Sequence, residues 1–160
     1  MLEFCQWLDQ TTVGSTIRQS LWLFPAIETV HLLGMAALVA TITILDLRLL
    51  GWAMLQKRVS EVTAHLLPWA WLGFGVQVVT GVLLFSSEAV KIYGNPAFRL
   101  KMLLLLLAGI QALIFQTVVS HKLPAWDDRP VLPVIAKIMG LTSILLWLGI
   151  VTAGRFIGFV

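Results

Sequence analysis

Four long apolar runs set the limits on what this chain can fold into. They extend over residues 21–45, 66–85, 102–120 and 138–154, and most charged side chains lie between them. A helix needs about 20 mostly apolar residues to cross the hydrocarbon core of a bilayer. Since 59% of the 160 residues are hydrophobic and only 12% are charged, the chain has too little polar material to cover a water-soluble domain of this size. The runs therefore predict four transmembrane helices.

The continuity of the runs predicts helices and excludes a transmembrane β-barrel, whose strands alternate apolar and polar positions. Short connections favour antiparallel neighbours, and helices satisfy every backbone hydrogen bond within lipid. We therefore expect an all-α membrane protein, an antiparallel four-transmembrane-helix bundle that forms a single domain over residues 1–160. Residues 2–8 place apolar side chains among polar neighbours. This pattern is typical of a short helix at the membrane surface, so we expect an interfacial helix at the N-terminus.

An even number of spans puts both termini on one side of the membrane, here named side A; the opposite side is side B. Lysines and arginines divide almost evenly between the two sides, so the rule that positive loops stay in the cytoplasm discriminates weakly. If acidic partners occupy Arg99, Lys101 and Arg155 on side A, side B becomes cytoplasmic and both termini are periplasmic. The net charge of +3 is spread over helix ends and loops, where it favours anionic lipid headgroups. No nucleic-acid partner is expected.

The stretch ETVHLLG, residues 28–34, puts an acid and an imidazole inside the first apolar run. At about 100° per residue, Glu28, His31 and Met35 fall in one sector of a helix, which must then face the other helices. Ionisable groups cost about 2.5–3.5 kcal/mol each at the centre of a membrane helix, so each needs a partner or a function. For Glu28 the structural expectation is an ion pair with a basic side chain toward side A, where the candidates are Arg99, Lys101 and Arg155.

The three histidines predict a cofactor site. Neutral imidazole is the commonest metal ligand in proteins and a frequent ligand of haem iron. His65 opens the second run and His121 closes the third, so antiparallel neighbours would bring the two rings to nearly the same depth, where they could hold a porphyrin. His31 lies toward the other side and needs a different partner, for which Met35 and Met102 are candidates. The alternative interpretation is that histidines at membrane boundaries only cap their helices.

These residues lead to three functional hypotheses. The first is a small b-type cytochrome-like protein that transfers electrons or responds to redox state, with haem b on His65, His121 and His31; a b-type haem needs no CxxCH motif. The second is a copper or small-solute transporter that uses His31, Met35 and Glu28. The third is a non-catalytic accessory or scaffold protein in which Glu28 and His31 complete a hydrogen-bonded core. The sequence contains no set of residues typical of a catalytic site, so enzyme activity is not expected.

Other polar and small residues inside the runs favour close helix packing. The polar residues are Gln77, Thr80, Gln111, Gln116, Thr142 and Ser143. Such side chains hydrogen-bond between helices and contribute about 0.6–2 kcal/mol each. Small residues recur in all runs and include Gly34, Ala37, Gly73, Gly81, Gly109 and Gly140. Gly154 and Gly158 form a small-xxx-small element, which is consistent with a homo-oligomer or a larger membrane complex. Asp46 and Arg48 are expected to lie together at the membrane interface and to be structural.

Five segments together resemble a known family. They are SLWLFPAIETVH, LDLRLLG, LLPWAW, NPAFRLKMLLLLLAG and GRFIGF. In this order they resemble a family of small bacterial four-span membrane proteins of unknown function, and the resemblance covers nearly the whole chain. It implies a bacterial inner-membrane protein and carries no established activity. The early helix with its Glu and His has a looser similarity to inner-membrane copper-resistance proteins, which are usually longer; the present chain lacks a rich set of Met and His residues.

Overall fold

The computed structural model describes residues 2–127 and 132–159, and within them four helical segments are long and apolar enough to cross a membrane. Three of these are the single helices α3 (Leu23–Leu50), α4 (Val59–Ser87) and α8 (Val134–Phe156). The fourth is α6 (Pro96–Ile114), which continues through a π turn and a 3-10 turn, η1 (Phe115–Val119) and η2 (Ser120–Lys122), into α7 (Leu123–Trp126). The prediction of an all-α protein with four membrane spans is therefore confirmed.

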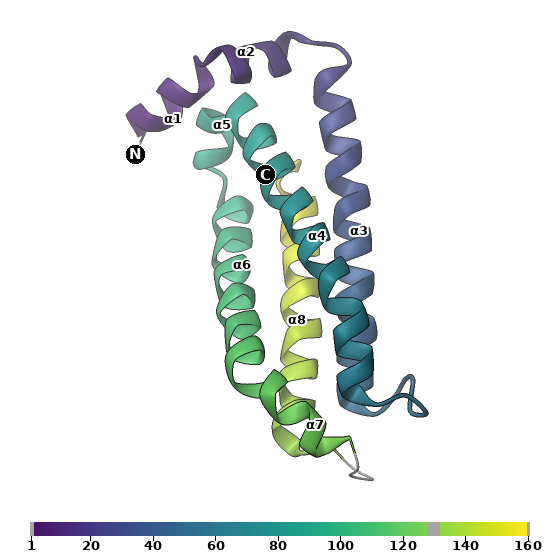
Figure 1. Cartoon of the computed structure of the whole chain (residues 1–160). Helices are drawn as coiled ribbons and strands as arrows, with labels where there is room; N and C mark the ends of the chain where they lie inside the picture. Colours follow the sequence, from purple (N-terminus) through teal and green to yellow (C-terminus); the bar gives the residue numbers. More distant parts are fainter. Residues whose placement is uncertain (1, 128–131, 160) are drawn as a thin grey trace.

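The four spans run antiparallel to the neighbours on which they pack (Figure 1). The most extensive packing joins α4 to α3, α3 to α8 and α8 to α6. The end helices of this series, α4 and α6, approach each other near side A, where the rings of Phe85 and Phe98 stack with centroids 5.3 Å apart. Both chain ends lie at the same end of the bundle. Large apolar side chains on the outer faces are exposed, as helices that contact lipid require.

The helices extend beyond the apolar runs of the sequence. α4 begins at Val59 where residue 66 was predicted, and α6 begins at Pro96 where residue 102 was predicted. The predicted boundaries were too narrow because hydropathy marks the hydrocarbon core, whereas the helices continue into the headgroup region. Asn95 caps the N-terminus of α6 with its side-chain oxygen, and proline in the first turn loses no helical hydrogen bond.

Two short helices lie across the side A end of the bundle where the sequence predicted one (Figure 1). They are α1 (Leu2–Asp9) and α2 (Thr12–Gln19), and together we name them the N-terminal helix pair. The break between them is explained by Thr11, whose side-chain oxygen caps the N-terminus of α2. The N-terminal helix pair packs on α4 and on the short helix α5 (Ala89–Tyr93).

Arg18 joins the N-terminal helix pair to the bundle. Its Nη1 atom lies 2.6 Å from Asp9 Oδ1 and donates a hydrogen bond of 3.1 Å to the Ser87 carbonyl at the end of α4. Cys5 is buried in α1, which packs on α5 and α4. The expected interfacial segment is thus a docked part of the fold, although its outer apolar side chains remain exposed.

At the side B end, α4 is capped by a residue from a distant segment. Arg58, at the N-cap position, supplies no side-chain cap. Asp127, just after α7, accepts hydrogen bonds from the Ser60 amide at 3.1 Å and from the Ser60 hydroxyl. Partial burial acts to raise the pKa of Asp127, but these hydrogen bonds, a further one from the Val59 amide and the charge of Arg58 hold the pKa below its usual value.

We predict that Asp127→Ala lowers the stability of the fold by about 0.5–2 kcal/mol at pH 7, the usual loss on removing a helix N-cap. Because the pKa of Asp127 is lower in the folded protein than in the unfolded chain, this contribution is complete above the unfolded value of about 3.9 and is lost as the pH falls through the folded value. The difference in thermal midpoint between wild type and Asp127→Ala should therefore shrink under acid conditions. A difference that is constant with pH would contradict the prediction, and Glu61→Gln, which alters an exposed carboxylate, serves as the control.

Candidate functional site

His31 lies on α3 in the side A half of the bundle, with its ring half-buried against α4. Its Nδ1 atom is 2.7 Å from Thr80 Oγ1. The Thr80 Oγ1 atom also lies 2.6 Å from the Val76 carbonyl oxygen. When the hydroxyl donates its only hydrogen to that carbonyl, its oxygen accepts a hydrogen bond from His31 Nδ1–H. This arrangement selects the imidazole tautomer with its proton on Nδ1. Its Nε2 lone pair has no partner in the described part of the chain.

A second hydrogen bond holds the same part of α3 against α4. Gln77 Nε2 donates to the His31 backbone carbonyl at 2.5 Å. Gly81 lies beside the ring, where an added Cβ atom would be 3.5 Å from His31 Cε1. The sequence predicted that Gln77 and Thr80 hydrogen-bond between helices, and the structure confirms this and identifies His31 as their shared partner. Thr80 therefore orients the imidazole, while Gln77 holds the His31 backbone against the same helix.

Lys101 of α6 reaches the same region from the other side of the bundle. Its ammonium lies over Gly154 of α8, 3.4 Å from where a Cβ atom would stand on that glycine. It is also within electrostatic range of His31. The ion pairs found in residues 2–127 and 132–159 do not include Lys101. An imidazole on α3, a hydroxyl on α4 and an ammonium on α6 thus form one set, which we name the His31 site: His31, Thr80 and Lys101.

The acidic and basic residues predicted to pair near side A are not brought together. Glu28 is exposed on α3, and the ion pairs described for residues 2–127 and 132–159 do not include it. The Arg99 guanidinium lies 5.5 Å from the centre of the Tyr93 ring, and that of Arg155 lies 5.4 Å from the centre of the Phe159 ring. These cations have aromatic partners in place of the expected carboxylate.

The other predicted ligands are separate from the His31 site. His65 and His121 are both exposed toward side B, and His65 Nδ1 lies 3.3 Å from the Glu61 carbonyl of its own helix. No hydrogen bond joins the two imidazoles among the described residues, although the side B end of α4 packs on α7. Met35 is half-buried one turn from His31. Within the described chain, no three His, Cys, Asp or Glu side chains gather as a metal site.

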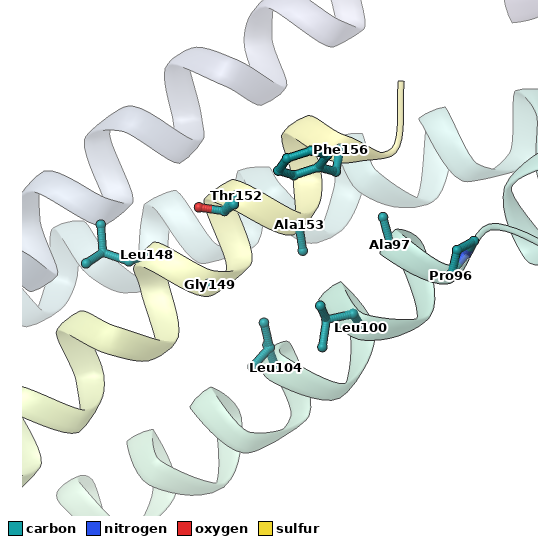
Figure 2. A pocket seen from close by; sticks show the side chains of 9 residues that line it. All are labelled: Pro96, Ala97, Leu100, Leu104, Leu148, Gly149, Thr152, Ala153 and Phe156. Atoms are coloured by element: carbon teal, nitrogen blue, oxygen red, sulfur yellow. The ribbon is translucent and has the colours of Figure 1, made fainter. Parts of the chain in front are cut away.

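An apolar groove follows α6 and α8 on the side A half of the spans (Figure 2). It has a volume of about 590 Å³. The side chains that line it are Pro96, Ala97, Leu100, Leu104, Leu148, Gly149, Thr152, Ala153 and Phe156. Only a threonine among them is polar, so acyl chains suit this groove and it offers no group for chemistry. The His31 site is therefore the candidate functional site.

Comparison with known proteins gives a family and no activity. A family model described as a family of unknown function, DUF6644, matches residues 4–160. No curated protein and no solved structure matches the chain. The match covers nearly the whole chain and confirms the resemblance to a family of unknown function.

Proposed function

We propose that this chain, which belongs to the family of unknown function DUF6644, is a b-type haem-binding membrane protein in which His31 supplies the axial nitrogen. The observation that carries the proposal is the open Nε2 of a ring whose Nδ1–H is held by Thr80. Imidazole ligands of metals usually donate their second ring N–H to a neighbouring acceptor, which fixes the tautomer and the ring plane. His31 is preorganised in this way, inside a membrane span.

The surroundings of Lys101 favour a ligand that carries an anionic group. No carboxylate of the described chain forms an ion pair with it, and a half-buried ammonium without a counter-ion is stabilised by an anionic partner. A porphyrin offers propionate groups together with iron, so it could engage both Lys101 and His31. Haem, when bound, supplies reversible one-electron chemistry. In this proposal Thr80 keeps the proton on Nδ1, His31 presents Nε2 and Lys101 neutralises a carboxylate.

The proposed haem site has a definite place in the membrane. Four apolar spans contact the lipid bilayer, and the family resemblance favours a bacterial inner membrane. With side B cytoplasmic and both termini periplasmic, the His31 site lies in the periplasmic half of the membrane. An electron-transfer or redox role then requires a partner on that side. A homo-oligomer through the Gly154 and Gly158 element is compatible with this arrangement.

The test is an absorption spectrum of the purified full-length chain, expressed in cells supplied with a haem precursor and measured oxidised and reduced. We expect a Soret band and about one haem per chain; His31→Ala should lower the haem content at least tenfold. A double variant, His65→Ala with His121→Ala, is the matched control and should keep the band. Lys101→Met should lower haem occupancy several-fold without changing the band position. His31→Gly with added imidazole should recover the band.

Carbon monoxide binding distinguishes a haem held by His31 from one held by His65 and His121. One axial histidine leaves a coordination position open for it, whereas a bis-histidine site does not. The proposal would be wrong if carbon monoxide leaves the spectrum unchanged, the His65 and His121 double variant loses the Soret band and His31→Ala keeps it. These results would instead support a haem held between His65 and His121, as expected from the sequence. A colourless protein that takes up no added haem would overturn the proposal. Stoichiometric copper in such a sample would favour transport, and a metal-free oligomer would favour a scaffold.

A further inference from the structure

Outside the His31 site, the ionisable side chain of Asp46 also lies inside the spans, near side B and far along α3 from His31. Asp46 is only 4% exposed. Its Oδ2 atom has no hydrogen-bond partner among the described residues. The expected pairing with Arg48 at the membrane interface is wrong, because Arg48 donates from Nε and Nη2 to the Lys57 carbonyl at 3.0 and 2.7 Å. Asp46 is therefore a buried carboxyl without its predicted cation.

Helix α8 covers this carboxyl. A Cβ atom on Gly140 would lie 2.9 Å from the Asp46 backbone oxygen, so the α8 backbone is in direct contact with α3 at this point. Ser143, nearly one turn further along α8, brings its hydroxyl near the Asp46 side chain. Among the described residues, the side-chain group near the carboxyl is thus a neutral hydroxyl, which can donate to it or accept from it.

Within residues 2–127 and 132–159, no positive charge forms an ion pair with Asp46. On α3 the nearest cation, Arg48, is engaged with a backbone carbonyl. On α8 the nearest is Lys137, and at the start of α4 the charged or titratable groups are Arg58, Glu61 and His65. None of these forms an ion pair with Asp46 in the part of the chain that the structure describes. An isolated charge in this position is strongly disfavoured, whereas a carboxylic acid needs only hydrogen bonds.

We propose that Asp46 is a proton-binding site: it carries a proton as a carboxylic acid at neutral pH and releases it only when the contact between α3 and α8 loosens. The ligand is a single proton, since the pair of Asp46 and Ser143 offers too few oxygen atoms to enclose a metal cation. Release creates a negative charge on a buried side chain where α8 packs on α3. Protonation of Asp46 is thereby coupled to the packing of these two spans, independently of any ligand at the His31 site.

The test is infrared spectroscopy of the full-length chain in lipid nanodiscs. A protonated carboxyl has a C=O band separate from those of ionised carboxylates. We expect such a band at pH 7, shifted in D₂O, absent in Asp46→Asn and retained in Glu28→Gln, which removes the exposed carboxyl of the same helix. Labelling the four aspartates with ¹³C at the carboxyl should shift the wild-type band, which assigns the band to an aspartate even if Asp46→Asn folds poorly.

Two results would overturn the proposal. One is the lack of any carboxylic acid band at pH 7 in the folded wild-type protein. The other is a band that ¹³C-aspartate leaves in place and that disappears in Glu28→Gln, which would assign the proton to the exposed glutamate. Retention of the band up to a pH at which the protein begins to unfold is the expected behaviour of a carboxyl whose release requires the two helices to separate.

Discussion

Replacing Gly14 by alanine is expected to detach the N-terminal helix pair from the side A end of the bundle. A Cβ atom at this position would stand 2.4 Å from the Ser86 carbonyl oxygen and 3.0 Å from that of Leu8. Both atoms belong to backbone, so no side-chain rotation relieves the contact. Overpacking of this kind costs about 1–3 kcal/mol. The hydrogen bond from Arg18 to the Ser87 carbonyl depends on the same contact and should be lost with it.

Cys5 provides the measurement, because it is the single cysteine of the chain and is 3% exposed in α1. Its reaction with a maleimide follows the population of molecules in which the helix pair is open. A loss of about 1–3 kcal/mol should raise that rate roughly 5- to 150-fold. Gly94→Ala is the control, since a Cβ atom there meets nothing within 4 Å. Equal labelling rates for wild type and Gly14→Ala would show that α2 does not rest on α4 through this glycine.

The four spans could be predicted from the sequence because hydropathy is a local signal. Which spans pack on one another could not be predicted. Apart from the sector of Glu28 and His31 in the first run, the runs have no stripe of polar residues that marks which side meets another helix. The contact between α3 and α8 depends on Gly140, and that between α3 and α4 on Gly73, against which Leu38 packs. Both glycines were identified as small residues that permit close packing. Composition alone does not say which helix packs against each glycine.

The residues of the His31 site could be predicted only in part, for the same reason. The helical spacing placed Glu28 and His31 in one sector, but His31 is half-buried while Glu28 is exposed. The two residues lie about 60° apart around a helix, which is enough for one to face α4 and the other lipid. Sequence reasoning also named Thr80 and Lys101 without joining them to His31. Their meeting depends on how three helices are arranged, and no single run carries that information.

Asp46 was misjudged for a related reason. Its position directly after the first apolar run, residues 21–45, indicated the headgroup region, where Arg48 would be a natural partner. The end of a helix in sequence is a poor measure of burial, because a neighbouring helix can cover the last turns. Here α8 does so through Gly140. A polar residue near a span boundary can therefore be as buried as one at the centre.

The contact over Asp46 gives the second large prediction. Gly140→Ala should destabilise the bundle, because its Cβ atom would lie 2.9 Å from the Asp46 backbone oxygen and 3.3 Å from Leu49 Cβ. Alanine favours a helix over glycine by up to about 1 kcal/mol, and the clash costs about 1–3 kcal/mol. The net effect should be a loss of stability. Gly109→Ala in α6 meets nothing within 4 Å, so it should be neutral or stabilising.

Gly140→Ala is thus expected to lower stability and Gly109→Ala is not, although the chemical change is the same. Equilibrium unfolding in mixed micelles with increasing SDS would measure both against wild type. Destabilisation by Gly140→Ala with no loss in Gly109→Ala would place the tight contact of α8 on α3 where the structure has it. Equal changes in both variants would mean that helix propensity alone governs the result. In that case α8 would not be in direct backbone contact with α3 at Asp46, and the cover over that carboxyl would have to come from elsewhere.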